Sequence, residues 1–352
     1  MKNSVTIGNR TISQDAPCFL VAELSANHGG SLERAIEIVH AAAEAGADAV
    51  KFQTYTPDTM TIECDGDPFH VKGGLWDGYS LFQLYREAHT PWEWHEELFA
   101  AAESCGLIGF STAFDASSVA FLERFNPPCY KVASFEIVDL PLLRCIAATG
   151  RPVIFSTGMA SLKEIDDAVQ TLRAGGCDQL IALKCVSSYP ADPGDFNIRT
   201  IPNLAATFDC LAGLSDHCLS NAVAVGAVAL GARVIEKHLT LRRSDGGPDA
   251  GFSLEPAEFA ELVRMVRDAE KAMGTVRYGT GISEAGNVCF RRSLIAVENI
   301  AEGNAFNLEN VRVIRPGDGL SPKHLESVIG QVAAMAIKRG TPLTWGHVGA
   351  PA

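Results

Sequence analysis

Residues 211–240 read "LAGLSDHCLSNAVAVGAVALGARVIEKHLT" and hold two short apolar runs on either side of an alanine- and valine-rich segment. The runs are almost continuously apolar, which is typical of strands buried on both faces of a parallel sheet. The segment between them looks helical. The stretch is therefore predicted to form strand, helix and strand, with His217 and His238 at equivalent ends of neighbouring strands.

The same alternation recurs along the chain. Apolar runs that precede helix-like segments occupy 18–24, 48–54, 107–114, 129–135, 152–158, 180–186, 210–217 and 233–239. Eight such units over roughly 270 residues match the size of a closed barrel of alternating strands and helices. A doubly wound sheet is the alternative, but it rarely needs eight parallel strands in sequence. The predicted fold class is α/β, a (β/α)8 TIM barrel.

The pattern changes after Gly279. The remaining sequence has short strand-like runs, many turn residues and no alternation of strand and helix. A separate domain of roughly 65 residues accounts for this change. We expect a barrel domain over 1–278, a linker over 279–288 and a small C-terminal domain over 289–352.

Composition limits the class of function. The chain has 352 residues and a net charge of -13, so its surface should repel nucleic acid and anionic membranes. Its ten cysteines form no C-x-x-C pair, and several lie in apolar runs where a free thiol acts as a small hydrophobe. The N-terminus has no signal-like apolar core, and no apolar run approaches membrane-spanning length. A reduced, cytoplasmic protein is expected, and an anionic substrate would need a locally basic pocket.

A long insertion, residues 55–91, follows the second predicted strand. It is a βα loop, so it should lie over the end of the barrel where active sites form. Loops of this length in compact domains are usually functional. Its rings, Phe69, His70, Trp76 and Tyr79, suit covering a sugar or excluding water. A surface loop without a role is the alternative.

The two histidines predict a metal site. Neighbouring strand ends lie about 5 Å apart, so His217 and His238 could present two imidazoles to one ion. Core or capping histidines are the alternative. Two neutral imidazoles with open positions suit Mn²⁺ better than Mg²⁺, which prefers oxygen ligands; Co²⁺ is a further choice. Such an ion would polarise an acceptor carbonyl.

Three lysines, Lys51, Lys131 and Lys184, lie inside strand-like runs. A buried lone ammonium is costly, so each needs a partner. With the hydroxyls at the strand ends they could cradle a phosphate and a carboxylate. Structural ion pairs with Glu23, Glu136 or Glu236 are the alternative. The predicted site would suit joining a phosphorylated, carboxylated donor to a carbonyl acceptor.

Several segments carry a resemblance to one family. They are "AELSANHGGSLERA", "AGADAVKFQTYTPDTMT", "YKVASFEIVDLPLL", "STGMAS", "GLSDH" and "IEKHLTLRRSDGGPDAGFSLEP". Together they resemble the sialic acid synthase (NeuB-like) family of phosphoenolpyruvate-dependent nonulosonate synthases. The tail "GNAFNLENVRVIRPGDGLSP" resembles the family's C-terminal antifreeze-like (SAF) domain. Within the family, "LWDGYSLFQLYREAHTPWEWH" and "KVASFEIVDLP" look most like the pseudaminic acid synthases.

The resemblance implies condensation of phosphoenolpyruvate with 2,4-diacetamido-2,4,6-trideoxy-L-altrose and water. It implies a homodimer in which Arg315 of the SAF domain reaches the partner's barrel. By the same resemblance, the metal ligands are His217 and His238, and the catalytic groups are Glu23, Glu136 and Asp249. The implied phosphoenolpyruvate contacts are Lys51, Thr112, Lys131, Ser134, Ser156, Ser187 and Ser215, and the implied sugar contacts are Asn27, Gln53, Trp76, Tyr189, Glu236, Phe290 and Arg315. Ser187 departs from the family, where an asparagine is common.

Three other interpretations stay open at this point. An N-acetylneuraminate or legionaminate synthase would use the same chemistry on another N-acetyl sugar. A Schiff-base aldolase would use Lys184 as its nucleophile. A barrel that only binds sugars would keep the pocket without turnover, although the presence of both rim histidines with Glu23, Lys51 and Lys131 argues against it.

Overall fold

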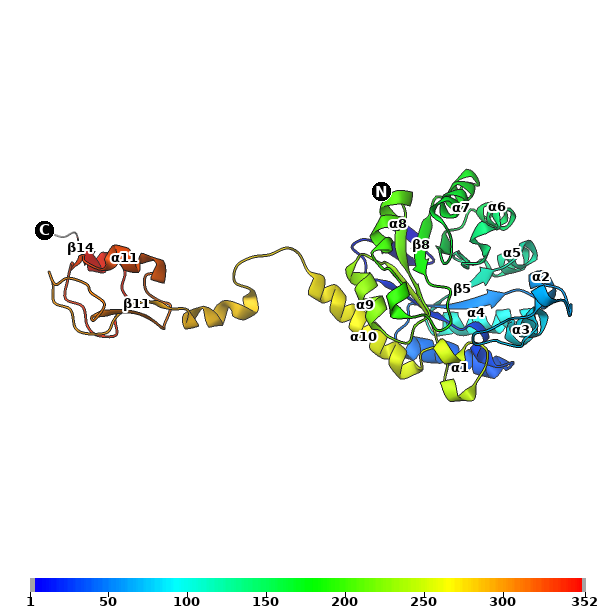
Figure 1. Ribbon diagram of the computed structural model, residues 1–352, viewed down its shortest axis with the longest axis horizontal. Coiled ribbons are helices and arrows are strands. Elements are labelled where there is room, and N and C mark those ends of the chain that lie inside the picture. The colour runs from blue at the N-terminus through cyan, green and yellow to red at the C-terminus, as the bar shows by residue number, and fades with distance from the viewer. Residues whose placement is uncertain (1–3, 350–352) are drawn as a thin grey trace. The chain divides into compact units, whose positions relative to one another are not determined.

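The protein is described by a computed structural model that covers residues 4–349 and divides after Gly274 into two compact units (Figure 1). The first unit is a closed barrel of eight parallel strands in which β10 pairs with β3. The predicted (β/α)8 fold is thereby confirmed. Its strands are β3 (Phe19–Glu23), β4 (Ala49–Thr54), β5 (Ile108–Ala113), β6 (Tyr130–Val132), β7 (Val153–Ser156), β8 (Leu180–Cys185), β9 (Leu211–Asp216) and β10 (Val234–His238).

Each strand is followed by a helix on the outside of the barrel (Figure 1). Side-chain caps start several of these helices: Ser31 accepts from the Arg34 amide, and Ser161 accepts from the Glu164 amide. The helices are α1 (Leu32–Glu44), α4 (His95–Ser104), α5 (Ala116–Leu122), α6 (Leu140–Ala147), α7 (Leu162–Ala174), α8 (Thr200–Phe208), α9 (Ala222–Ala229) and α10 (Pro256–Met273).

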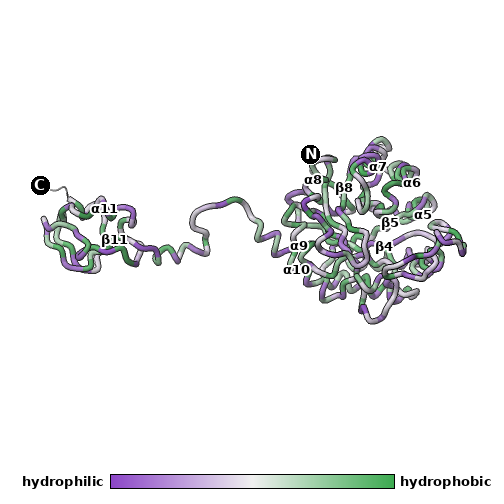
Figure 2. Tube along the Cα trace, in the orientation of Figure 1, coloured by the Kyte–Doolittle hydropathy of each residue, from purple (hydrophilic) through white to green (hydrophobic). Residues whose placement is uncertain are grey.

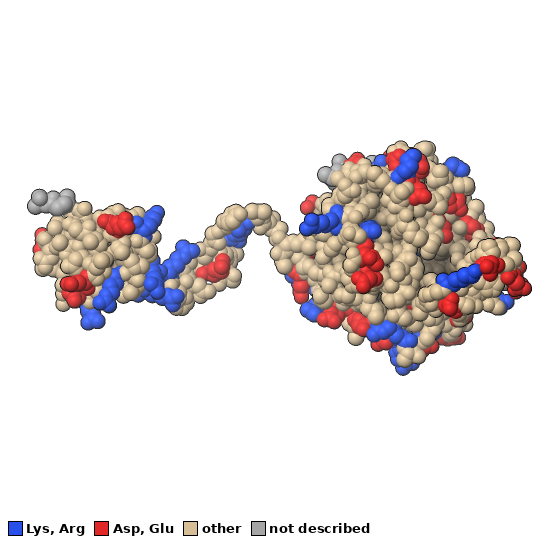
Figure 3. Space-filling view, in the orientation of Figure 1, with Lys and Arg blue, Asp and Glu red and all other residues tan. Residues whose placement is uncertain are grey.

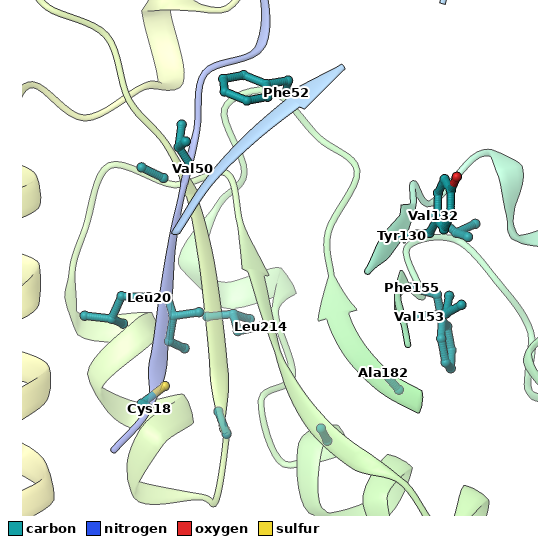
Figure 4. Packing of buried hydrophobic residues seen from close by; sticks show 14 of the residues in the cluster. Cys18, Leu20, Val50, Phe52, Tyr130, Val132, Val153, Phe155, Ala182 and Leu214 are labelled. Carbon is teal, nitrogen blue, oxygen red and sulfur yellow. The ribbon is translucent and has the colours of Figure 1, made fainter. Parts of the chain in front are cut away.

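The strands are buried on both faces, which explains their continuous apolar sequences (Figure 2). Outward-facing side chains such as Leu20, Phe52 and Leu214 belong to the core between strands and helices (Figure 4). Inward-facing residues at the amino ends of the strands form a second core. An N-terminal hairpin, β1 (Ser4–Ile7) and β2 (Arg10–Ser13), packs into that core and closes the barrel opposite the site.

The insertion after β4 contains α2 (Pro57–Met60) and α3 (Leu81–Ala88), joined by 3-10 turns. Ser80 caps α3 by accepting a hydrogen bond from the Gln83 amide. The chain then returns to the barrel through Trp92–Trp94 and α4. The insertion is thus a folded unit of its own between a strand and its helix, rather than an open loop.

The second unit has its own core, which includes Leu294, Phe306, Val328 and Leu343. Its strands pair in two short antiparallel sheets: β11 (Ser293–Ala296) with β12 (Val311–Ile314), and β13 (Val332–Ala333) with β14 (Val348–Gly349). The helix α11 (Leu325–Val328) completes it. A 3-10 helix over Ile282–Phe290 overlaps the segment 279–288 that the sequence predicts as linker. Within residues 4–349, no helix is both long and apolar enough to cross a membrane.

The two units differ in charge. Residues 275–352 contain eight Lys and Arg against six Asp and Glu, which leaves 21 against 36 for residues 1–274. The net charge is therefore +2 for the small unit and -15 for the barrel unit. Figure 3 shows basic side chains gathered along the start of the small unit, and both signs scattered over the barrel.

Candidate active site

A cavity of about 380 Å³ opens at the carboxyl ends of the strands. Every one of the eight strands, or the loop directly after it, supplies part of its wall, as barrel sites require. The polar and charged wall residues are Ser25, Lys51, Gln53, Thr112, Lys131, Ser134, Glu136, Ser156, Tyr189, Ser215, His217, Glu236, His238 and Asp249. Of these, only Ser25 is absent from the predicted set.

Two ammonium groups lie at the bottom of the cavity. Lys131 donates to Ser156 Oγ at 2.7 Å, and Lys51 donates to Thr112 Oγ1 at 2.9 Å. Lys51 also lies 2.6 Å from Glu23 Oε2. Glu236 Oε1 is 3.8 Å from Lys51 and 3.9 Å from Lys131. Lys51 and Lys131 therefore each have an ionic partner and also face the cavity. The sequence left an anion cradle and structural ion pairs as alternatives, and this arrangement is compatible with both.

Hydroxyl groups extend this basic floor toward β6, β7 and β8. The Gly158 amide donates to Ser134 Oγ at 3.2 Å. A Cβ on Gly158 would lie 2.2 Å from Ser187 Oγ, so glycine is needed there to make room for both serines. Ser187 Oγ is buried without a hydrogen-bond partner in the structure, although Ser187 is not part of the cavity wall. A hydroxyl left unpaired beside Ser134 suits an oxygen-rich ligand.

The two histidines meet at the cavity edge. Their ring centroids are 5.3 Å apart, with His238 at the end of β10 and His217 one residue beyond β9. His217 Nδ1 lies 2.8 Å from the carbonyl oxygen of Val186, which places a hydrogen on Nδ1, so the neutral ring presents its lone pair at Nε2. Burial lowers the pKa of His238 far below its usual value, so this imidazole is neutral.

These imidazoles fit a divalent metal ion. His238 Nδ1 is buried and has no hydrogen-bond partner in the structure. Among residues 4–349 no group of three His, Cys, Asp or Glu side chains is arranged to hold a metal. A site with two histidine ligands, of which His238 is neutral and has an unpaired nitrogen, suits an ion whose remaining coordination positions are filled by substrate and water.

A hydrogen-bonded chain of side chains crosses the wall between β3 and the loop after β10. Gln53 Nε2 donates to Glu23 Oε1 at 3.0 Å and to Ser25 Oγ at 2.9 Å, and Ser25 in turn donates to Asp249. Glu23 is fully buried, one layer below the wall. Burial raises the pKa of Glu23 to about 7, against the opposing effect of Lys51.

Glu136 follows β6 and lines the cavity. One of its carboxyl oxygens, Oε2, is buried without a partner, and burial raises the pKa of Glu136 to about 7. A carboxyl group with this pKa can gain and lose a proton near neutrality.

This raised pKa predicts how stability depends on pH. The folded-state pKa of Glu136 is about 7 against 4.5 when unperturbed, so this group lowers stability progressively between pH 4.5 and 7 and has its full destabilising effect above pH 7. Glu136→Gln is expected to raise the free energy of unfolding at pH 8 by roughly 1–3 kcal/mol, with the gain shrinking toward pH 5. Urea unfolding of the wild type and of Glu136→Gln at pH 8 and at pH 5 measures this difference in the free energy of unfolding.

Glu123→Gln is the matched control, because the hydrogen bond from Arg151 lowers the pKa of Glu123. The stability from this group is present above pH 5 and is lost as the pH falls through the lowered folded-state value. Glu123→Gln should therefore destabilise the protein at pH 8. A Glu136→Gln protein that is less stable than the wild type at pH 8 would contradict the raised pKa.

The insertion forms an apolar side of the cavity. Trp76 donates from Nε1 to the carbonyl oxygen of Pro248 at 2.8 Å, and its ring lies 5.2 Å from that of Tyr189. Tyr189 in turn lies 4.5 Å from the His217 ring. The other apolar and aromatic wall residues from this part of the chain are Tyr55, Met60, Val71, Leu81, Leu84, Tyr85 and Ala88. Phe69, His70 and Tyr79, which the sequence also singled out, are not in the wall.

Comparison with known proteins places the chain in a family. The model of the NeuB family matches residues 38–278, and the model of the SAF domain matches residues 291–349. The chain belongs to the NeuB family. The resemblance expected from the motifs is confirmed, and so is the SAF fold of the C-terminal unit.

Three relatives illustrate this NeuB-family membership. The chain is 44% identical to "Pseudaminic acid synthase" of Campylobacter jejuni serotype O:2, over 97% of this chain and 98% of the relative. It is 41% identical to the protein of the same name from Helicobacter pylori, over 93% and 97%. The crystal structure of N-acetylneuraminic acid synthetase from Leptospira borgpetersenii, in complex with citrate, matches with a TM-score of 0.72 and 31% identity, over 82% and 97%.

Asn27 and Lys184 lie outside the cavity wall, as Glu23 and Ser187 do. Asn27 donates from Nδ2 to the carbonyl oxygen of Leu239 at 3.0 Å and to Ser253 Oγ at 2.9 Å. These bonds use both amide hydrogens, and Asn27 Oδ1 is buried without a hydrogen-bond partner. Asn27 is absent from the cavity wall, and its sugar contact remains a prediction. Lys184 donates to the carbonyl oxygen of Cys185 at 3.1 Å and is also absent from the wall, which disfavours a Schiff base there although burial lowers the pKa of Lys184.

Phe290 and Arg315 belong to the SAF unit. The Arg315 guanidinium lies 5.9 Å from the centroid of the Phe290 ring, and this ring is 59% exposed.

The sequence missed several wall residues. Phe252 lies 4.8 Å from the His238 ring and 6.0 Å from that of His217, and Cys185 Sγ lies 3.9 Å from His217 Nδ1. Cys185 ends a predicted strand, so its position next to the rim could have been read from the alternation along β8. Phe252 lies in a loop without periodicity, and no local signal could have placed it.

Proposed function

We propose that this chain is a pseudaminic acid synthase. It would condense phosphoenolpyruvate with 2,4-diacetamido-2,4,6-trideoxy-L-altrose and water, giving pseudaminic acid and phosphate. The observation that carries the proposal is 44% and 41% identity, over nearly the whole chain, to two proteins of that name. The lower identity of 31% to an N-acetylneuraminic acid synthetase makes that activity the alternative. The free thiols fit a reduced, cytoplasmic setting.

The basic floor of the cavity suits the phosphoenolpyruvate anion. Lys131 with Ser156 and Lys51 with Thr112 offer two ammonium groups, each held by a hydroxyl. Ser134 and the nearby Ser187 add further hydroxyls, and Ser215 donates to Glu236 at 3.1 Å. Charge-assisted hydrogen bonds of this kind hold phosphate and carboxylate groups strongly.

His217 and His238 would hold the divalent ion, Mn²⁺ in preference to Mg²⁺, with Co²⁺ as a further choice. When bound, the ion supplies Lewis acidity to the open-chain aldehyde of the acceptor. Tyr189, Trp76 and Phe252 close the same end of the cavity with aromatic surface. They would exclude water from the aldehyde and orient the sugar beside the enol donor.

The bond changes balance as follows. C3 of phosphoenolpyruvate attacks the aldehyde carbon, a water oxygen adds to C2, and the bond between C2 and the bridging oxygen breaks to release phosphate. The water loses one proton as it adds, and the new alkoxide gains one. When phosphate leaves, the hydroxyl at C2 becomes the ketone, and its proton goes to the released phosphate. Glu136 touches the cavity and Glu23 lies just below it, and both have a pKa near 7 that suits these transfers.

Acceptor comparison tests the proposal. The protein with phosphoenolpyruvate and Mn²⁺ is assayed for phosphate release with the altrose, mannose and glucose types of N-acetyl acceptor. The proposal predicts the highest kcat/KM for the 2,4-diacetamido-trideoxy-altrose. A clear preference for N-acetylmannosamine would make the chain an N-acetylneuraminate synthase, and phosphate release without any acceptor preference would contradict both assignments.

Trp76 is expected to contribute to this choice. Its apolar surroundings favour a methyl group over a hydroxyl at C6 of the acceptor, and one such group is worth about 10-fold or more in selectivity. Trp76→Ala should lower the ratio of kcat/KM between 6-deoxy and 6-hydroxy acceptors by about 10-fold. Tyr79→Ala, in the same insertion but outside the wall, is the control. An unchanged ratio in the Trp76 variant would remove the insertion from acceptor selection.

We also propose that the SAF unit of one subunit reaches the barrel of a second subunit. The net charges of +2 and -15 favour such contact between copies. Four large apolar side chains are exposed between β6 and the first residue of α7: Phe135, Val138, Met159 and Leu162. Apolar surface beside a cavity is typical of an interaction site, and Phe290 with Arg315 would supply the other side.

Complementation between subunits tests this arrangement. Arg315→Ala and His217→Ala are each expected to be inactive as pure proteins. Co-refolded or co-expressed in equal amounts, they should recover about a quarter of wild-type activity, since half of the dimers are mixed and each mixed dimer has one complete site. No recovery from a mixture that forms mixed dimers would contradict the exchange of SAF units.

A further inference from the structure

Ser25 adopts an unusual backbone conformation directly beside the cavity. Among residues 4–349, five residues other than glycine have a positive φ, and three of them are Asn or Asp, which tolerate the left-handed region. The other two are Ser25, with φ 49°, and Met159, with φ 62°. Ser25 is 2% exposed and lies in the cavity wall, whereas Met159 is 66% exposed and does not.

Strained residues of this kind persist where the surrounding structure holds them, and they cluster at functional sites. Glycine would adopt the same φ without strain. The left-handed φ therefore does not explain the choice of serine at this position. Compared with glycine, serine adds a hydroxyl group here. The hydrogen bonds of that hydroxyl therefore indicate why the position holds serine.

The Ser25 hydroxyl joins two side chains that face the acceptor end of the cavity. It donates to Asp249 Oδ2 and accepts from Gln53 Nε2 at 2.9 Å. The Ala26 amide donates to the same Asp249 oxygen at 3.4 Å. Both bonds from the Ser25–Ala26 segment thus go to Oδ2, and neither occupies Oδ1 of Asp249.

The same hydroxyl fixes the orientation of the Gln53 amide. Gln53 Nε2 donates to Glu23 Oε1 at 3.0 Å as well as to Ser25. With two acceptors in place, both hydrogens of the Gln53 amide nitrogen are used, so the amide cannot reverse without losing both bonds. Removing the Ser25 hydroxyl would free one hydrogen of Gln53 and one oxygen of Asp249, and both groups could then rotate.

We propose that Ser25 is a positioning residue that aims Asp249 and Gln53 at the acceptor sugar, and that its strained backbone is retained for this purpose. The proposal rests on the synthase function proposed above. It assigns Ser25 no part in holding phosphoenolpyruvate, because the basic floor formed by Lys51 and Lys131 does not bond to it.

Ser25→Gly separates this role from a structural one. The variant loses the hydroxyl and also relieves the strain, so its melting temperature should equal or exceed that of the wild type. Its kcat/KM for the altrose acceptor should fall at least 10-fold, while its Kd for phosphoenolpyruvate, measured by calorimetry without acceptor, stays within about two-fold. Ser25→Ala should lose as much kcat/KM but melt below Ser25→Gly, because it keeps the strain without the hydroxyl.

Asn126→Gly is the control. It replaces another residue in the left-handed region, with φ 50°, in the loop before β6 and outside the cavity wall, and should leave the acceptor kinetics unchanged. Unchanged acceptor kinetics in Ser25→Gly would overturn the proposal, and so would an equal loss of phosphoenolpyruvate binding together with a lower melting temperature. A wild-type protein that turns over no acceptor would instead overturn the synthase function itself.

Discussion

Replacing either rim histidine by alanine is expected to lower kcat/KM by about a thousand-fold or more. Lewis-acid stabilisation of developing charge is worth several kcal/mol, and either His217→Ala or His238→Ala would leave the ion with one protein ligand. Titration of the metal-free protein with Mn²⁺ should show the loss of the tight site. Binding of phosphoenolpyruvate in the absence of metal should be nearly unchanged, since Lys51 and Lys131 remain.

His70→Ala provides the matched histidine control. His70 lies in the insertion at the same end of the barrel but outside the cavity wall. Its replacement should leave metal affinity and kcat/KM within about two-fold. If both rim variants kept full activity in the presence of a chelator, the metal-assisted mechanism would have to be abandoned.

The second large effect is expected at Lys131. Burial lowers the pKa of the Lys131 ammonium, the effect of Glu236 opposes this, and the group faces the cavity from β6. Truncating one partner of a buried, hydrogen-bonded charge pair costs about 2–5 kcal/mol. Lys131→Met should therefore lower kcat/KM for phosphoenolpyruvate by about 10²–10³-fold and weaken its binding measured directly.

Lys184→Met is the matched lysine control and also separates two mechanisms. Lys184 lies in β8 but bonds only to a backbone carbonyl outside the wall. Its replacement should leave the activity within a few-fold of the wild type, and borohydride should trap no substrate on it. Inactivation of Lys184→Met with a trapped adduct would favour the Schiff-base aldolase, while equal losses in both lysine variants would contradict the anion cradle.

The barrel and most of the cavity could be predicted from the sequence because both depend on local patterns. Strands buried on both faces must be apolar, and parallel strands in a closed barrel bring their carboxyl ends together, so His217 and His238 could be placed next to each other. The same reasoning placed Lys51 and Lys131, because strand alternation sets which side chains point inward.

The contacts that the sequence could not place lie where the chain leaves the strands. Asn27 lies in a 3-10 turn, and neither motif nor periodicity shows that its amide donates to the loop after β10. Trp76, predicted as a sugar contact, lies in the cavity wall and Phe69 does not, and the folded insertion decides which ring reaches the wall. Ser25 depends on a hydrogen bond to Asp249, more than 200 residues away in the sequence, and Phe252 depends on ring contacts with His238 and Tyr189.

The most direct measurement follows the bridging oxygen of phosphoenolpyruvate. The enzyme is incubated with Mn²⁺, the altrose acceptor and phosphoenolpyruvate labelled with ¹⁸O between C2 and phosphorus. The account predicts one phosphate for each nonulosonate formed, with the label in the phosphate, because the C2–O bond breaks. Label retained in the sugar product, or phosphate released without nonulosonate, would contradict it.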